Sequence, residues 1–299
     1  MCVAFWGISK KRTPNHLQAK HLIHSIQITS PRKESRVAAV KNHMLAIYKK
    51  EMRSYFINPI GYVYMGIFLV FSALLACYTT LISESYKTSQ YFTYMIFAFI
   101  ILIPLLTMRL FAEERKLRTE QLLLTAPVTI TGMVLGKYLA ALTMYVGTVL
   151  ISCINFVPIY VIAAAERAGD KTSMAHIGPV TAQLVGSVVA IILLGAAFIA
   201  IGTFISSLTE NQLSAAVVTI GVLCVMVLLN MVNNIKDSDG QQIISSYLIR
   251  SVINWLSVLS RYYNFSYGIF DFAALLYYCS ISFVFIFLTI RVYEKRRWG

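Results

Sequence analysis

Histidines are the first candidates for chemistry, because imidazole groups bind metals and transfer protons. Four of the five histidines lie in the first 43 residues, namely His16, His21, His24 and His43. Their spacing is irregular, and no framework of cysteines or acids stands beside them, as a zinc site would require. A metal cluster and an unstructured basic tail are both open interpretations, and the composition favours the tail. No metal site is predicted.

The segment from Gly132 to Lys137 is the next candidate, because it resembles a phosphate-binding loop. It has three residues between its glycines where such a loop has four, and Tyr138 follows where Ser or Thr is required. The chain is therefore predicted to bind no nucleotide and no cofactor of its own.

The remaining reactive side chains form no catalytic pattern. Cys2 lies in the tail, and the other cysteines stand singly in four apolar segments, at Cys77, Cys153, Cys224 and Cys279. No serine elbow, HExxH motif or pair of intramembrane carboxylates occurs. Arg109 is the only charge well inside an apolar run, and intramembrane charges usually mark proton or ion paths. No catalytic residue is predicted, and a proton-coupled carrier is disfavoured.

The apolar runs themselves dominate the sequence. Of 299 residues 58% are apolar and only 13% are charged, with a mean hydropathy of +0.67, which is more apolar surface than a soluble core needs. A bilayer crossing takes roughly 20 apolar helical residues. Six transmembrane helices are predicted, at about 59–82, 91–111, 134–165, 180–205, 213–232 and 269–290. The third exceeds one crossing and contains Pro158, so we expect a kink or a helix that projects from the membrane.

The basic residues predict the orientation. If both termini are cytoplasmic, the inner segments carry 20 of the 26 Lys and Arg residues. This asymmetry follows the positive-inside rule and favours a multi-pass membrane protein in contact with lipid. The expected location is a bacterial cell membrane. On so apolar a chain, nucleic-acid binding is not predicted.

Residues 1–43 are predicted to be a basic, disordered extension, and residues 44–299 the membrane domain. Met44 opens an amphipathic lead-in helix to Asn58 and is an alternative site for the start of translation. The predicted outer loop from Ile235 to Gly268 contains a set of apolar residues at helical spacing, namely Leu248, Val252, Trp255, Leu256 and Leu259. Short re-entrant helices and a surface amphipathic helix are both open interpretations of that set.

The segment between the second and third runs is predicted to be a charged amphipathic helix that Pro127 ends. Leu117, Gln121 and Leu124 share one face, and the charged residues from Glu113 to Glu120 are displaced from it. An interfacial helix and a docking helix would both show this pattern.

Several of these segments, in order, resemble one family. They are similar to permease subunits of type-2 ABC transporters, and most similar to the gliding-motility type. The similar segments are Tyr55–Pro59, Pro104–Arg115, Gly136-Lys137-Tyr138 and Gly202–Gln212. One departure is present. Where the family often has Gly-Thr-x-Glu-Leu-Leu, this chain has Arg118-Thr119-Glu120-Gln121-Leu122-Leu123.

This resemblance implies an all-α, six-helix permease of an exporter, coupled to a separate cytoplasmic ATPase that holds ATP and Mg²⁺. It also implies a second permease protomer, identical or different. The coupling helix would span about Glu113 to Pro127, and the turn from Ser206 to Gln212 would make a second contact. The residues implied in coupling are Glu113, Glu114, Arg115, Arg118, Thr119, Glu120, Gln121, Leu122, Leu123, Pro127, Thr209 and Glu210.

Two other classes of function remain open. A non-transporting scaffold of an ABC-like complex would share every feature above. An intramembrane enzyme would need a polar cluster at one depth, for which the candidates are Asn155, Asn230, Asn233 and Asn234. Amides without acids or bases are poor catalysts, which disfavours the enzyme.

Overall fold

The computed structural model describes residues 44–82, 88–121, 128–169, 178–234, 248, 251, 253, 257–268 and 271–298. These residues form helices and turns, with no strand among them. Six helices are long and apolar enough to cross a membrane, which confirms the predicted all-helical fold. The predicted tail 1–43 lies outside the described residues, as do Val252, Trp255 and Leu256 of the outer loop.

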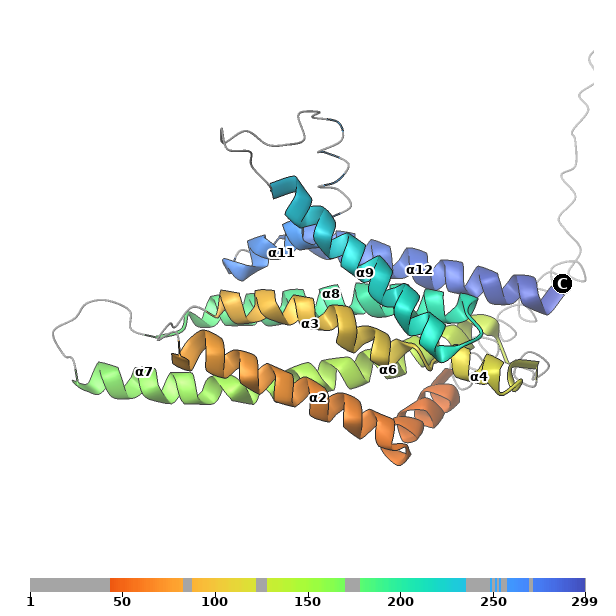
Figure 1. Ribbon diagram of the computed structural model, residues 1–299, viewed down its shortest axis with the longest axis horizontal. Helices are drawn as coiled ribbons and strands as arrows, with labels where there is room; N and C mark the ends of the chain where they lie inside the picture. The colour runs from red at the N-terminus through yellow and green to blue at the C-terminus, as the bar shows by residue number, and fades with distance from the viewer. Residues whose placement is uncertain are drawn as a thin grey trace, which may run out of the picture.

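The helices follow the predicted runs closely (Figure 1). After a lead-in helix over 44–57 come α2 (Pro59–Ala76) with the π-helical η1 (Cys77–Ile82), α3 (Ser89–Thr107), α4 (Ala112–Lys116), α6 (Ile130–Ser152), the 3₁₀ turn η2 (Cys153–Phe156), α7 (Val157–Gly169), α8 (Thr181–Leu208), α9 (Gln212–Asn234), α11 (Val258–Ser266) and α12 (Phe272–Trp298). The last helix runs eight residues beyond its predicted end, because a charged tail can continue a helix outside the apolar run.

Prolines set two of the helix boundaries. Pro59 stands at the start of α2, where its missing N–H costs nothing, and the chain turns between the lead-in helix and α2 at Asn58. Pro158 follows η2, which interrupts the third run as predicted. This span covers 37 residues, about 55 Å of helix against a hydrocarbon core of about 30 Å, and α7 projects past the other helices in Figure 1.

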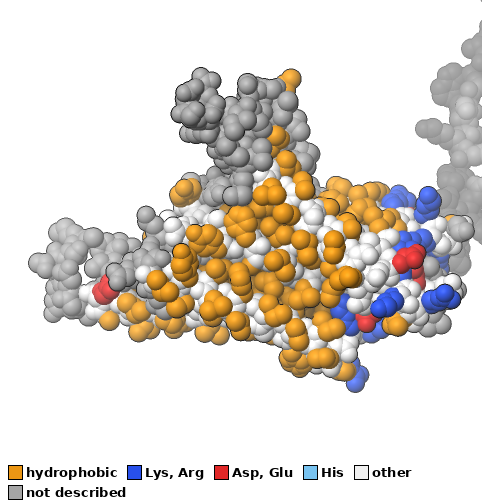
Figure 2. Space-filling view, in the orientation of Figure 1, with side chains coloured by type: hydrophobic (Ala, Val, Ile, Leu, Met, Phe, Trp, Pro, Cys, Tyr) orange, Lys and Arg blue, Asp and Glu red, His pale blue; other side chains and the backbone are white. Residues whose placement is uncertain are grey.

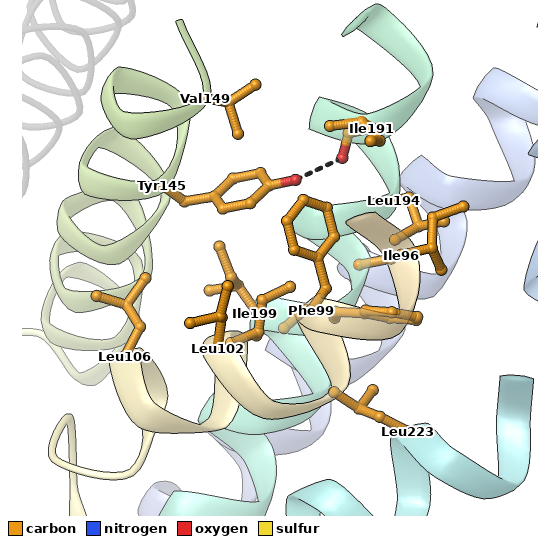
Figure 3. Close-up of a cluster of buried hydrophobic side chains, with 14 of the residues drawn as sticks. Ile96, Phe99, Leu102, Leu106, Tyr145, Val149, Ile191, Leu194, Ile199 and Leu223 are labelled. Atoms are coloured by element: carbon orange, nitrogen blue, oxygen red, sulfur yellow. Dashed lines mark hydrogen bonds between the residues drawn. The ribbon is translucent and has the colours of Figure 1, made fainter. Parts of the chain in front are cut away.

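Helix α8 is the centre of the bundle, and it packs against α3, α6, α9, α11 and α12. Figure 3 shows the core around it, where the Tyr145 hydroxyl donates a hydrogen bond to the carbonyl oxygen of Ile191 at 2.7 Å. Small residues allow this close packing. A Cβ atom at Gly195 would overlap the Tyr145 ring, and one at Gly202 would overlap Thr107.

The charged side chains gather at one end of the bundle, where the described chain ends (Figure 2). This charged end comprises the lead-in helix, the segment 108–121, the start of α6, the turn 208–212 and the end of α12. The visible flank of the bundle is largely apolar, which suits contact with lipid.

Candidate functional site

The turn between α3 and α4 is fastened to the central helix by one hydroxyl group. The backbone N–H groups of Phe111 and Ala112 both donate to the buried Ser206 Oγ at 3.2 Å. That hydroxyl in turn donates to the carbonyl oxygen of Met108 at 3.3 Å. Because the first turn of a helix has unpaired N–H groups, Ser206 stabilises the start of α4 from a distant element. The position of α4 therefore depends on α8.

Lys137 joins three elements at the charged end. Its side chain is only 2% exposed, and Nζ lies 3.1 Å from Glu51 of the lead-in helix and 2.8 Å from Glu114 of α4. It also donates to the carbonyl oxygen of Leu110 at 2.6 Å and lies 5.1 Å from the centre of the Phe111 ring. A buried ammonium group requires such partners. Lys137 thus ties α6 to both segments.

Neighbouring groups complete this corner. Arg109 makes a bidentate pair with Glu113, at 2.9 and 3.0 Å. The Tyr55 hydroxyl donates to the carbonyl oxygen of Leu106 at 3.5 Å. Burial raises the pKa of the Tyr55 phenol, and the nearby Glu51 carboxylate raises this pKa further, so the donor keeps its proton. Arg109 therefore lies at the end of its membrane helix, paired and away from the centre of the span.

Glu120 is a second shared group. Its carboxylate accepts from Arg296 at the end of α12 at 3.0 Å and pairs with Arg115 of α4 at 3.3 Å. Arg115 also donates to the carbonyl oxygen of Leu208 at 2.9 Å and pairs with Glu210 at 3.2 Å. The segment after α3 is therefore held to α12 and to the turn between α8 and α9.

The predicted continuous helix from Glu113 to Pro127 is wrong in its described part. Helix α4 ends at Lys116, a turn follows at 117–119, and helix resumes at 120–121. Arg118 has a φ of 57° and donates its N–H to the Arg115 carbonyl oxygen, while Thr119 donates to that of Glu114, both at 3.0 Å. This is a Schellman motif, whose left-handed position glycine usually fills. Arg118 stands where the resembling permeases often have a glycine.

The turn leaves an outward surface. Leu117 is 64% exposed, and Lys116, Arg118 and Gln121 are exposed beside it, whereas Glu114, Arg115 and Glu120 point into the ion pairs. The segment thus has an inner side that binds its own chain and an outer side that is open.

A comparison with protein families bears on the open classes of function. Residues 24–298 match the sequence model of a family described as ABC-2 family transporter protein. The chain belongs to the ABC-2 transporter family. Among curated proteins, none matches it. Membership in the ABC-2 family makes the chain a multi-pass membrane component of transport. It supports a permease subunit and implies association with a cytoplasmic ABC ATPase.

The ABC-2 family match also gives a context for the predicted site residues. The structure brings Glu113, Glu114, Arg115, Arg118, Thr119 and Glu120 together with Glu210 at one end. Thr209, the residue after α8, donates its hydroxyl to the Ile205 carbonyl oxygen of that helix. Leu122, Leu123 and Pro127 lie outside the described residues. Whether these residues contact an ATPase stays a prediction.

The contacts of four residues of this site were not predicted from the sequence, namely those of Glu51, Lys137, Ser206 and Arg296. Lys137 was considered as part of a phosphate loop and of the Gly136-Lys137-Tyr138 segment, without an ion-pair partner, although a lysine just inside an apolar run indicates a buried partner. The other three have no local pattern, since their partners lie far along the chain.

The structure also bears on the intramembrane enzyme. Asn155 donates its amide to Ser72 Oγ at 3.0 Å, near η2, and Ser72 donates in turn to the Leu69 carbonyl oxygen. This contact holds α2 against η2, and neither side chain of the pair is an acid or a base. Within the described part of the chain, no group of His, Cys, Asp or Glu could hold a metal ion.

Proposed function

We propose that this ABC-2 family chain is the permease subunit of an ATP-driven exporter, with both termini and the charged end in the cytoplasm of a bacterial cell. ATP and Mg²⁺ would be bound by a separate ATPase subunit, and a second permease protomer would complete the transport path. The observation that carries this proposal is the two-sided segment 112–121, with an open outer surface and an inner side that is ion-paired to the bundle.

The outer side is the proposed contact with the ATPase. Leu117 presents an apolar side chain between the cationic Lys116 and Arg118, which suits a groove with an apolar floor and acidic rims. Leu122 and Leu123 would extend this contact. Away from these acidic rims, the exposed carboxylate of Glu210, 82% accessible on its side chain, would accept a hydrogen bond from a donor of the ATPase.

The inner side would transmit the motion. When ATP closes the partner subunits, a pull on segment 112–121 would act on α12 through Glu120 and Arg296, on α8 through Ser206, and on α6 through Lys137. Each tie joins a different membrane helix, so that one displacement would rock several helices together. A scaffold in which no helix moves would not need one segment to be bound to three membrane helices.

Co-purification tests the docking surface. A tagged chain expressed in its own host should retain a soluble subunit that carries a phosphate loop. Leu117→Asp should lose most of that subunit, because an acid would face the proposed acidic rims. Trp298→Asp, which places an acid on another exposed apolar side chain of the charged end, should keep it. Equal retention by both variants would exclude this docking surface.

Glu120→Gln separates docking from transmission. The amide keeps the size of the side chain but loses the charge that pairs with Arg115 and Arg296. The variant should retain the ATPase at wild-type stoichiometry, while ATP-driven uptake of solute into inverted vesicles falls severalfold. If the wild-type complex hydrolyses ATP but moves no solute, the scaffold is the correct function.

A further inference from the structure

A pocket of about 330 Å³ opens at the charged end beside the buried Lys137. The lead-in helix supplies one wall, with side chains at successive helical turns, and α4 with its flanking turns supplies the other. This size is at the small end of the roughly 300–1,000 Å³ of ligand pockets. The lining residues are Lys50, Glu51, Ser54, Asn58, Arg109, Glu113, Glu114, Leu117, Thr119 and Lys137.

The pocket lies at the depth where lipid headgroups meet the bundle. Asn58 directly precedes the start of α2, and Arg109 follows the end of α3 by two residues, so both mark the boundary of an apolar span. Phe56, Ile57, Tyr62 and Val63 are exposed next to this boundary, with exposed fractions from 47% to 66%. Such side chains would lie against the acyl chains of a lipid.

The charges of the pocket are balanced. The lining contains three acidic and three basic residues, whereas the chain as a whole has a net charge of +13. An anion or a cation would therefore meet repulsion from half of these groups. A zwitterion would meet an opposite charge at each of its ends. The balance favours a zwitterionic ligand.

The donors and acceptors of the pocket select one kind of zwitterion. Lys50 is 64% exposed at the rim, and Arg109 has N–H groups beyond the two that Glu113 accepts, so both can donate to a phosphate. Carboxylates accept hydrogen bonds from a primary ammonium group. A trimethylammonium group has no N–H, and it binds best in an aromatic cage. The lining contains no aromatic residue among those described.

We propose that this pocket binds the headgroup of a phosphatidylethanolamine-type lipid, with the phosphodiester at Lys50 and Arg109 and the ammonium at Glu51 and Glu113. Such a lipid would bridge the lead-in helix and α4, two elements already joined through Lys137. The proposal does not depend on ATP coupling, since it requires only a chain embedded in a membrane.

Native mass spectrometry of the purified chain in detergent, with phosphatidylethanolamine, phosphatidylcholine or phosphatidylglycerol of the same acyl chains added, tests this proposal. We expect phosphatidylethanolamine to bind about tenfold more tightly than the other two, the effect of one hydrogen bond to a charged group. Equal binding of the ethanolamine and choline lipids would overturn it, and so would preferential binding of the glycerol lipid.

Two variants and one competitor complete the test. Lys50→Gln should reduce the preference severalfold, whereas Lys49→Gln, which removes the same charge from an exposed neighbour outside the pocket, should not. Ser54→Leu should block the pocket sterically. A preference that survives both Lys50→Gln and Ser54→Leu would place the lipid elsewhere and overturn the site. Free phosphoethanolamine should compete only weakly, and full competition at the same concentration would identify a soluble ligand in place of the lipid.

Discussion

Lys137 shows how one side chain can decide the packing of an entire end of a membrane protein. Its ammonium group is withdrawn from water, and it is compensated by two carboxylates and a carbonyl oxygen that come from the lead-in helix and the segment 108–121. Such an arrangement contributes little net stability, because desolvation offsets most of the attraction. Its loss is nevertheless costly, because the two carboxylates would remain close together without a cation between them.

Lys137→Met should therefore destabilise the chain by about 3 kcal/mol, the low end of the cost of breaking a buried pair, because Glu51 and Glu114 keep 15% and 17% exposure. Thermal unfolding in detergent measures this change. The exposed Lys116→Met serves as the control and should have little effect. Adding Glu51→Gln and Glu114→Gln to Lys137→Met should recover part of the loss. A triple variant that is less stable than Lys137→Met would contradict the argument.

At the scale of elements, the six membrane helices could be predicted because each apolar run is long enough to cross the bilayer by itself. The end of α4 could not. Glu, Arg and Lys favour helix, and the spacing of the apolar residues predicted a helix that continues through residues 117–119. The ion pair between Arg296 and Glu120 could not be predicted either, because the two residues are 176 positions apart and no local pattern relates them.

Arg118 adopts a left-handed conformation that costs roughly 1–2 kcal/mol for a residue other than glycine. Arg118→Gly should raise the stability by about 0.5 kcal/mol, because the greater freedom of glycine in the unfolded chain offsets part of the relief. Arg118→Val should lower it, since a β-branched side chain is least tolerated there. Thermal midpoints should rank glycine above arginine above valine. Glycine at the neighbouring helical Lys116 should instead destabilise, and the reverse order would exclude the Schellman turn.

Helix α8 packs closely against its neighbours at two glycines, and substitutions there give a second test at the scale of elements. Gly195→Ala and Gly202→Ala should each destabilise the bundle by about 1–3 kcal/mol, because the added methyl group would overlap Tyr145 or Thr107. Gly66→Ala and Gly147→Ala are matched controls in α2 and α6, where an added Cβ would meet nothing within 4 Å. They should be neutral or stabilising. Similar thermal shifts for both pairs would mean that α8 is less tightly packed.

At the scale of the whole molecule, the distribution of charge is what makes the two ends different. The charged end gathers the ion pairs of segment 112–121, whereas the other end carries α7, which extends past its neighbours and bears the exposed Glu166. Since lysine and arginine are retained on the cytoplasmic side during insertion, this asymmetry predicts a single orientation. The proposed docking of an ATPase requires the same orientation, so that one measurement tests both.

Cysteine labelling in intact cells provides that measurement. In a background without native cysteines, Ala165→Cys on α7 should react with a membrane-impermeant maleimide added outside, because both Ala165 and its neighbours are exposed. Lys116→Cys, equally exposed at the charged end, should react only after the membrane is permeabilised. Labelling of both sites in denatured samples controls for expression and reactivity. If Lys116→Cys were labelled in intact cells and Ala165→Cys were not, the orientation would be inverted, and segment 112–121 could not meet a cytoplasmic ATPase.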